Sequence, residues 1–360
     1  MEKIKVNLFE NSYNVYTGVS LSDFADYLKE RNCPGNLLVI TDTIVGKIYG
    51  GRVMDKLVGC GFMPAIALIP AGEKYKTLDT VKELYSACID AELDRHSLII
   101  ALGGGVVGDI SGFVAATFKR GVPFVQVPTT LLAMVDASVG GKTGVNLKES
   151  KNLIGSFYQP KMVFTDISTL KTLKKREFAS GISEIIKYGV IKDKSFFGYI
   201  EKNIGRIKSL DPKALEYAVN KSCVIKKGIV EIDEKESGIR AILNFGHTIG
   251  HAIEAVTEYK KYLHGEAVAI GMVCASDISV RLGIFGKKDA ERLKNLIKKA
   301  GLPVNHRLNA DKIIRKLIYD KKVKNGKTNF ILPFRKIGSV VIKDDVPEKI
   351  INDALREVKK

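Results

Sequence analysis

Three of the five histidines lie close together in the chain, and their spacing suits metal or phosphate binding. The first two occur in Leu243-Asn244-Phe245-Gly246-His247-Thr248-Ile249-Gly250-His251, and the third follows thirteen residues later in His264-Gly265-Glu266. At i and i+4 of a helix, His247 and His251 project from one face, where imidazoles can bind a metal ion or a phosphate. The alternative is a pair of helix-surface histidines with no ligand. A third group is needed to choose between these interpretations.

A carboxylate that could join the histidines stands in Gly181-Ile182-Ser183-Glu184-Ile185-Ile186-Lys187-Tyr188. Taken alone, Glu184 and Lys187 at i and i+3 predict a surface ion pair. Two imidazoles and one carboxylate would instead make a catalytic zinc site with an open position for a substrate oxygen. The spacing does not choose the ligands, because His247 with His251 is as plausible as His247 with His264.

A glycine-rich turn provides a candidate nucleotide site. The apolar run 98–102 leads into Gly103-Gly104-Gly105-Val106-Val107-Gly108-Asp109, and 110–118 predicts a helix. Glycines let the backbone approach a pyrophosphate, and the amides at a helix start attract its charge. The turn follows a later strand instead of the first, so a simple packing turn is the alternative. Asp42, at the end of the run 37–41, is a carboxylate that could hold an adenosine ribose.

A second loop suits anionic ligands without being a nucleoside-triphosphate loop. Val139-Gly140-Gly141-Lys142-Thr143 resembles the end of that motif, but Asp136 stands where its first glycine should be and no strand leads into it. The loop offers backbone amides and an ammonium group, and Lys151 and Asn152 follow closely. We therefore expect it to bind anionic or hydroxylated groups.

Apolar patterning predicts two domains. Short β-rich runs that alternate with helical patterns indicate a doubly wound α/β domain over 1–172. The expected strands are 37–41, 65–69, 98–102, 124–127 and 162–165, and the expected helices are 21–30, 45–59 and 77–93. Amphipathic segments dominate 173–360 and predict a mainly helical domain. These segments are 177–192, 213–233, 248–257, 265–282, 290–300 and 310–319, followed by a hairpin of 330–332 with 339–342 and a last helix that begins near Asp345 and Pro347.

Composition narrows the class of protein. With 360 residues, 45% of them hydrophobic, each domain can bury a core, and no apolar run is long enough for a membrane span. The five cysteines are scattered and form no Cys-x-x-Cys pair, so we expect reduced thiols in a cytoplasmic protein. The formal charge of +17 is compatible with anionic ligands. Because its lysines alternate with apolar residues at helical spacing, as in 287–299, nucleic-acid binding is disfavoured.

In combination the motifs resemble those of the 3-dehydroquinate synthase family, from about residue 35 to 335. The matching segments are Gly103 to Asp109 with Gly112-Phe113, Pro128-Thr129-Thr130-Leu131-Leu132, Asp136 to Thr143, Lys151-Asn152, Glu184-Ile185-Ile186-Lys187, Leu243 to Thr248 with Gly250-His251, and His264-Gly265-Glu266. Ala137 departs from the serine of many members, while Asp136 and Lys142 are retained. The resemblance implies a Rossmann-like nucleotide-binding domain, a helical metal and substrate domain, and an enzyme of the shikimate pathway.

The implied reaction converts 3-deoxy-D-arabino-heptulosonate 7-phosphate (DAHP) to 3-dehydroquinate and phosphate, with NAD and a divalent metal, zinc or cobalt. Its steps are a transient oxidation, elimination of phosphate, re-reduction and an intramolecular aldol closure. A sibling cyclase acting on a neutral sugar phosphate, and a metal-dependent alcohol dehydrogenase that releases NADH, are the alternative enzymes. A protein that only binds these ligands is the alternative outside enzymes.

The resemblance also assigns residues to roles. The implied metal ligands are Glu184, His247 and His264. The implied phosphate-side residues are Lys151, Asn152, Lys187 and His251, and those for the carboxylate and hydroxyls are Asp136, Lys142, Lys226, Arg240 and Asn244. Arg120 would reach the neighbouring subunit's site in a homodimer. The implied NAD-binding residues are Asp42, Gly72-Glu73-Lys74-Tyr75-Lys76, Gly105-Val106-Val107-Gly108-Asp109, Thr129-Thr130, Lys142, Lys151 and Thr169-Leu170-Lys171-Thr172. Asp320-Lys321-Lys322 also fits a family motif, in which either lysine could contact substrate.

Overall fold

The computed structural model describes residues 2–33, 35–147, 151–323 and 329–359. Its contacts divide the chain into a first unit, Met1–Leu173 with Lys226–Lys235, and a second unit, Lys174–Ile225 with Glu236–Lys360. The sequence predicted a single boundary at residue 172, whereas a later segment joins the first unit. Glu231 accepts a hydrogen bond from the Asn7 side chain at 2.9 Å, and the Gln159 amide donates to Glu234 at 2.8 Å. These contacts link residues that are far apart in sequence.

A seven-stranded sheet forms the centre of the first unit. Its strands are β1 (Glu2–Val6), β2 (Tyr13–Thr17), β3 (Asn36–Asp42), β4 (Met63–Ile69), β5 (Leu98–Gly103), β6 (Phe124–Pro128) and β9 (Met162–Thr165). Their order is β1-β2-β9-β6-β5-β3-β4, and all neighbours are parallel except β1 with β2. The five strands expected from the sequence are confirmed, and β1, β2 and the small hairpin of β7 (Lys142–Val145) with β8 (Ile154–Phe157) were not predicted.

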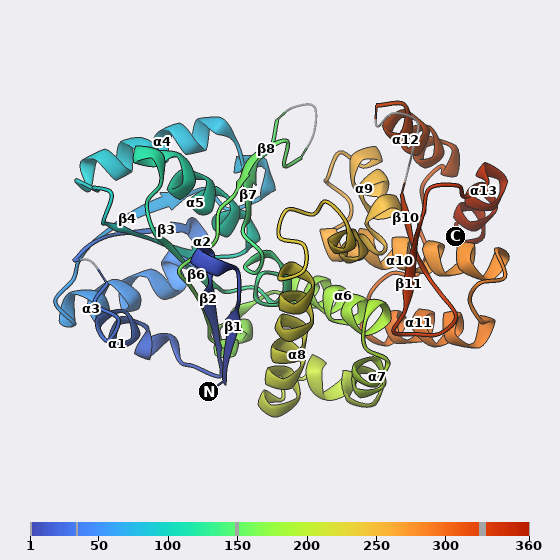
Figure 1. The fold of residues 1–360 in the computed structure, drawn as a ribbon, viewed down its shortest axis with the longest axis horizontal. Helices are drawn as coiled ribbons and strands as arrows, with labels where there is room; N and C mark the ends of the chain where they lie inside the picture. The colour runs from blue at the N-terminus through green and yellow to red at the C-terminus, as the bar shows by residue number, and fades with distance from the viewer. Residues whose placement is uncertain (1, 34, 148–150, 324–328, 360) are drawn as a thin grey trace. The chain divides into compact units, whose positions relative to one another are not determined.

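Helices cover both faces of this sheet (Figure 1). On β3, Leu38 and Ile40 pack with residues of α4 (Leu78–Asp90) and α5 (Gly105–Thr117). The alternating residues Leu37 and Val39 pack with α1 (Phe24–Lys29) and α3 (Gly51–Gly59), which follows the short α2 (Thr43–Val45). Because successive side chains of a strand point to opposite faces, a continuous apolar strand needs helices on both sides. The doubly wound α/β fold is therefore confirmed.

The second unit is mainly helical, as the sequence predicted. Its helices are α6 (Lys175–Ile191), α7 (Lys194–Lys208), α8 (Pro212–Val230, which ends in the segment of the first unit), α9 (His247–Val256), α10 (His264–Arg281), α11 (Lys287–Lys299), α12 (Ala310–Val323) and α13 (Glu348–Glu357). The predicted hairpin is present as antiparallel β10 (Phe330–Pro333) and β11 (Val340–Lys343). Helix α7 was not predicted, although Phe197, Ile200, Ile204 and Ile207 give it a buried face. Within the described ranges, no helix has both the length and the apolarity of a membrane span.

Glycines let α9 and α10 approach each other closely. Gly246, just before α9, has a left-handed φ of 80°, which a residue with a side chain rarely adopts. A Cβ on Gly271 of α10 would lie 1.9 Å from the Gly246 carbonyl oxygen, and one on Gly250 would lie 3.2 Å from the Ala267 carbonyl oxygen. The two helices that carry the three clustered histidines are therefore in backbone contact.

Candidate metal and nucleotide sites

Three helices of the second unit bring one carboxylate and two imidazoles together. Glu184 lies in α6, while His247 and His264 are the first residues of α9 and α10. The Nε2 atoms of His247 and His264 lie 3.8 and 4.0 Å from Glu184 Oε1, and one ligand atom from each residue lies within 4.8 Å of the others. This donor set matches a three-ligand zinc-type site. The geometry thus joins the three residues that the family resemblance implied as ligands.

The Glu184 carboxylate is buried, and its Oε2 atom forms an ion pair with Lys187, while Oε1 has no hydrogen-bond partner among the described atoms. The side chains of Glu184 and Lys187 are 0% and 1% exposed, so the interpretation as a surface ion pair is wrong. The apolar residues on both sides of this segment place its i, i+3 pair inside the unit. A buried carboxylate needs positive partners, and a divalent cation bound by His247 and His264 would supply one.

His247 is held as a neutral imidazole. Its Nδ1 lies 3.1 Å from the Phe245 carbonyl oxygen, to which a protonated Nδ1 donates a hydrogen bond. The lone pair of the neutral ring is then on Nε2, which faces Glu184. Burial, followed by the positive charges of Lys187, His264 and His251, lowers the His247 pKa well below its usual value of 6.5. The neutral form is the one that binds a metal, so His247 is a ligand-competent imidazole at neutral pH.

His251 is exposed on α9 and belongs to a second group of possible ligands, which shares His264 with the first group. Its ring centroid lies 5.4 Å from that of His247, but its ligand atom groups with those of Glu254 and His264. Among the described residues, Glu184 forms a three-ligand group with His247 and His264, and none is found that combines Glu184, His247 and His251. The open choice between His251 and His264 is thus narrowed in favour of His264.

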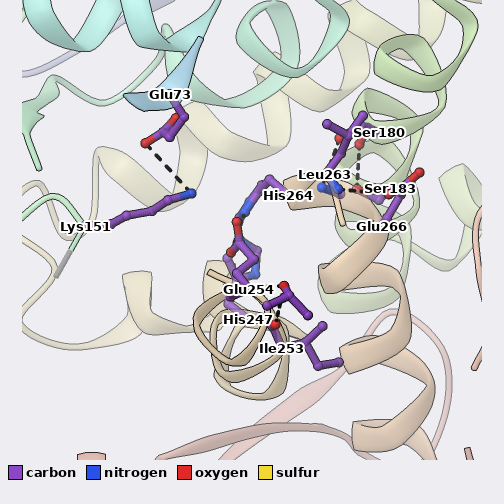
Figure 2. A network of polar contacts seen from close by, with 12 residues as sticks. Glu73, Lys151, Ser180, Ser183, His247, Ile253, Glu254, Leu263, His264 and Glu266 are labelled. Carbon is purple, nitrogen blue, oxygen red and sulfur yellow. Dashed lines mark hydrogen bonds and ion pairs between the residues drawn. The ribbon is translucent and has the colours of Figure 1, made fainter. Parts of the chain in front are cut away.

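The start of α10, which carries His264, is anchored to α6 and to its own first turn (Figure 2). The Gly265 amide donates to Ser180 Oγ at 2.9 Å, and the Leu263 amide donates to Glu266 Oε2 at 2.9 Å. A Cβ on Gly265 would lie 2.1 Å from the Ser180 carbonyl oxygen, so a glycine is required at this contact. The motif His264-Gly265-Glu266 therefore combines a candidate ligand with the residues that fix its helix.

In the first unit, the glycine-rich turn has the geometry expected of a nucleotide loop. Strand β5 ends at Gly103, Gly104 precedes α5, and the helix begins at Gly105. A Cβ on Gly104 would lie 3.1 Å from Thr130 Cγ2 of the neighbouring segment, so the backbone passes close to it. The buried Thr129 hydroxyl has no hydrogen-bond partner among the described atoms. This strand, turn and helix start fit a bound phosphate group.

Predicted nucleotide and substrate residues of the first unit form a connected polar cluster. The Lys76 ammonium contacts the Asp109 carboxylate and the Asn152 side-chain oxygen. Glu73 lies 3.8 Å from the Lys151 ammonium (Figure 2) and accepts a 2.8 Å hydrogen bond from the Asn146 side chain. Burial raises the Asp109 pKa, and the neighbouring Lys76 acts in the opposite direction. The cluster joins the end of β7 to the 72–76 segment and to α5.

Other predicted residues occupy separate positions in the first unit. Lys226 contacts Asp136 twice, at 2.8 Å to the carboxylate and 2.7 Å to the main-chain oxygen. Asp42 caps the next helix by accepting hydrogen bonds from the Ile44 and Val45 amides. Lys142 and Arg120 are exposed, and the Lys74 ammonium lies over the ring of Tyr75, in the segment that follows Gly72. Val106, Val107 and Gly108 lie in the first turn of α5. The short helical segment that contacts the Tyr49 hydroxyl contains Thr169, Leu170, Lys171 and Thr172.

In the second unit, Arg240 is buried and the Asn244 amide donates to Glu236 at 2.8 Å. Glu236 and Glu254 are neighbours of candidate site residues that were not predicted from the sequence. Glu254 stands seven residues after His247, a spacing that places both on one helix face, so this signal was available in the sequence. The side chains of Lys321 and Lys322 lie outside the described residues.

Comparisons with known proteins agree with the sequence resemblance. The family model for the 3-dehydroquinate synthase N-terminal region matches residues 66–180, and the model for the C-terminal region matches residues 181–323. A 3-dehydroquinate synthase of Desulforamulus reducens is 50% identical over 97% of this chain and 98% of its own length.

Two solved structures are similar in fold. A 2-epi-5-epi-valiolone synthase of Streptomyces hygroscopicus with NAD+ and Zn2+ bound has a TM-score of 0.89 and 29% identity, covering 98% of each chain. A 2-deoxy-scyllo-inosose synthase complexed with carbaglucose-6-phosphate, NAD+ and Co2+ has a TM-score of 0.90 and 27% identity, covering 99% of this chain and 100% of its own. Since both family models match in order and the relatives align over nearly the whole chain, this protein is an enzyme of the 3-dehydroquinate synthase family.

Proposed function

We propose that this protein converts DAHP to 3-dehydroquinate and phosphate, using bound NAD and a divalent metal ion. The observation that carries the proposal is the convergence of Glu184, His247 and His264, with the Glu184 carboxylate buried and its Oε1 atom without a hydrogen-bond partner among the described atoms. When bound, NAD supplies a reversible hydride acceptor and the metal polarises a substrate hydroxyl. The identity of 50% to a 3-dehydroquinate synthase over almost the full length supports this substrate.

In the second unit, we assign metal binding to Glu184, His247 and His264. Glu184 supplies negative charge, and the two imidazoles supply neutral nitrogen ligands that leave a coordination position for a substrate oxygen. Lys187 balances the Glu184 charge before a metal binds, and its ammonium can then interact with a phosphate. The other substrate residues that we assign to this unit are His251, Arg240 and Asn244. His251, an exposed imidazole, can hydrogen-bond an oxygen of the leaving phosphate.

In the first unit, we assign NAD to the turn before α5 and to the polar cluster around Lys76. The α5 amides and the Thr129 hydroxyl are donors for the NAD phosphates, and Asp42 has a carboxylate for a ribose. The remaining residues of the NAD assignment are Gly72 to Lys76, Gly105 to Asp109, Thr130, Lys142, Lys151 and Thr169 to Thr172. Asp136, Lys142, Lys151, Asn152 and Lys226 are assigned to the substrate: the ammonium and amide groups provide contacts to its anionic groups, and the Asp136 carboxylate can accept hydrogen bonds from its hydroxyls.

We also propose a homodimer in which Arg120 completes the partner's site, zinc or cobalt as the metal, and a cytoplasmic location. Arg120 is exposed, and its guanidinium is suited to bidentate contact with a phosphate or carboxylate. A cytoplasmic location would place the enzyme with NAD and with phosphorylated sugar acids. From the positions of the assigned residues, we propose that NAD binds to the domain 1–172 and the metal ion to the domain 173–360.

Phosphate release from DAHP by the purified protein tests the function. We expect release that requires both NAD and zinc, stops on chelation, and yields 3-dehydroquinate with no net NADH. Accumulation of NADH with each turnover would instead identify an alcohol dehydrogenase. No phosphate release from DAHP under any metal, with turnover of sedoheptulose 7-phosphate or glucose 6-phosphate, would reject the proposed substrate in favour of a sibling cyclase.

The sibling cyclases are a specific alternative because the two similar structures have other synthase activities. Their identities to this chain are 29% and 27%, compared with 50% for the 3-dehydroquinate synthase. A sugar acid substrate also needs a cationic partner for its carboxylate, and Arg240 and Lys226 are buried cationic side chains that could provide one. We therefore place DAHP first among the three sugars to be assayed.

A further inference from the structure

Glu254 is a buried carboxylate to which the family resemblance assigned no role. It lies on α9, seven residues after His247, and its side chain is 3% exposed. Its Oε2 atom lies 3.3 Å from His264 Nδ1, on the side of the ring away from Nε2. Figure 2 shows His247, Glu254 and His264 gathered where α9 meets the start of α10. A buried carboxylate in this position needs a hydrogen-bond donor or a cation as its partner.

The tautomer of His264 connects Glu254 to the proposed metal site. A neutral imidazole has one protonated nitrogen and one nitrogen with a free lone pair. If Nδ1 carries the proton and donates a hydrogen bond to Glu254, the free lone pair is on Nε2, the atom that lies 4.0 Å from Glu184 Oε1. His247 has the same arrangement, because its Nδ1 faces the Phe245 carbonyl and its Nε2 faces Glu184. Each imidazole thus has an oxygen acceptor on the side opposite Glu184.

A second group of possible ligands shares His264 with the first. Ligand atoms of His251, Glu254 and His264 also lie within 4.8 Å of one another. A protonated Nδ1 cannot bind an ion, so the hydrogen bond to Glu254 and a cation on that side of the ring exclude each other. A neutral ring that binds a metal through Nε2 has its proton on Nδ1, and this N–H group needs an acceptor such as Glu254. The geometry therefore favours Glu254 as an acceptor for His264 over Glu254 as a ligand.

We propose that Glu254 is a positioning residue that orients His264 and fixes its tautomer for metal binding. The inference rests on the proposed metal site and identifies the group that prepares one of its ligands. The two histidines differ in one respect, since His247 has a neutral carbonyl acceptor and His264 a carboxylate. A carboxylate acceptor makes the ring a more basic ligand, and loss of such partners typically weakens metal binding by about 10- to 100-fold.

Metal binding by the full-length protein tests the role without depending on activity. The zinc dissociation constant of metal-depleted protein is measured by competition with a chromophoric chelator, and the visible spectrum is recorded after Co2+ is added. Glu254→Leu removes the acceptor at similar size, and we expect zinc binding about 10- to 100-fold weaker, with altered Co2+ bands because the His264 ring is no longer held. Glu254→Gln keeps an oxygen acceptor but removes the charge, and should rescue part of this loss.

Matched variants distinguish this role from a loss of folding or of nearby surface charge. Glu258→Gln is the control, because Glu258 is an exposed carboxylate just beyond α9 that pairs with Lys260, and it should bind zinc as the wild type does. Circular dichroism of the metal-depleted proteins checks folding, and if Glu254→Leu does not fold, Glu254→Gln provides the measurement, with a loss of up to about 10-fold.

Two results would overturn the role of Glu254. One is wild-type zinc affinity in both Glu254 variants while Glu184→Gln and His264→Ala lose zinc, which would retain the metal site and reject Glu254. The other is two ions per wild-type chain, of which the Glu254 variants lose only the weaker, since Glu254 would then be a direct ligand. The proposed metal site itself would fail on a different pattern, namely unchanged zinc affinity in Glu184→Gln and His264→Ala.

Discussion

At the scale of single residues, the proposed metal site is built from groups whose properties depend on burial. Glu184 and Lys187 are an ordinary helical pair in the sequence, but inside the protein they form a buried ion pair beside two imidazoles. In such a pair, each charge is stable because the other is present. Removing one partner therefore has a larger effect than an exposed pair would allow.

Replacing Lys187 by Met should destabilise the metal-depleted protein by about 3 kcal/mol, because Glu184 is left as a buried charge without its cation. Saturating zinc should recover part of this loss, since the metal would supply the missing positive charge. Urea unfolding with and without zinc measures both effects. Lys192→Met, at an exposed position just after α6, is the control and should change stability little. Equal stability of the two variants without metal would contradict the expected role of the ion pair.

At the scale of secondary-structure elements, the close contact of α9 and α10 sets the distance between His247 and His264. Gly271→Ala should lower stability by roughly 2–3 kcal/mol and weaken zinc binding, because its Cβ would lie 1.9 Å from the Gly246 carbonyl oxygen and would force the helices apart. Thermal unfolding and zinc competition provide the two readouts. Gly205→Ala in α7 is the control, because nothing lies within 4 Å of its Cβ, and it should be neutral or slightly stabilising. Similar losses in both variants would argue against the helix contact.

The attachment of α13 depends on a buried histidine and should make stability depend on pH. His306 contacts the Leu355 carbonyl through Nε2 at 3.1 Å, and its Nδ1 accepts from the Leu308 amide at 3.2 Å. Burial is the main cause that lowers the pKa of His306 below its usual 6.5. As the pH falls, this histidine is therefore protonated in the unfolded chain before it is protonated in the folded protein. The stability that His306 contributes is complete above pH 6.5 and is lost as the pH falls below it.

His306→Asn should therefore reduce the loss of unfolding free energy on acidification from pH 7 to pH 5. Denaturant unfolding at several pH values measures the slope, which can be compared even if the variant is less stable overall. His96→Asn, at an exposed position, should keep the slope of the wild type. The interpretation fails if the two variants have the same pH profile.

The sequence predicted the elements with strong apolar patterns and missed those that depend on distant contacts. The five continuous apolar strands and the amphipathic helices were recognisable because burial on one or both faces leaves a regular pattern. Strand β1, with its alternating charged residues, is a strand because β2 pairs with it, and β7 and β8 contain glycines. The position of Lys226–Lys235 in the first unit depends on contacts with Asn7, Asp136 and Gln159, which no local pattern encodes.

The same dependence on distant contacts explains which features of the candidate site could not be predicted from the sequence. Histidine spacing located the chemistry, but it left two ligand sets open, because the choice depends on how α6, α9 and α10 pack. The burial of Glu184 could not be deduced from an i, i+3 pair that is common on helix surfaces. Glu254 could have been noted from its spacing to His247, but its contact with His264 depends on the packing of α9 against α10.

At the scale of the whole molecule, the expected functions divide between the two units. The residues assigned to NAD all lie within 42–172, and the three assigned metal ligands lie in the second unit. Arg120 is the residue that we propose to act in the site of the partner chain. Arg120 is exposed three residues beyond the end of α5, in a run of three residues with positive φ values of 47° at Lys119, 66° at Arg120 and 126° at Gly121. Left-handed non-glycine residues are costly, and such strain is often found where a side chain has a functional position.

If Arg120 completes the partner's site, two inactive variants should restore activity to each other. Arg120→Ala lacks the arginine that its partner needs, and His264→Ala lacks a metal ligand in its own site. In a mixed dimer, the Arg120→Ala chain keeps its metal ligands and receives Arg120 from its partner, so one of two sites is complete. Coexpression in equal amounts gives about half mixed dimers, and hence about a quarter of the wild-type rate of phosphate release.

The control for this experiment replaces the His264→Ala chain by the double variant Arg120→Ala/His264→Ala. Mixed dimers of this pair contain no Arg120, so activity should not exceed that of Arg120→Ala alone. Differently tagged chains, purified in two affinity steps, ensure that only mixed dimers are assayed, for which the expected rate rises to about half of the wild type. Recovery with the double variant would mean that Arg120 is not needed from either chain. No recovery with either partner, in mixed dimers shown to be intact, would place Arg120 in the site of its own chain.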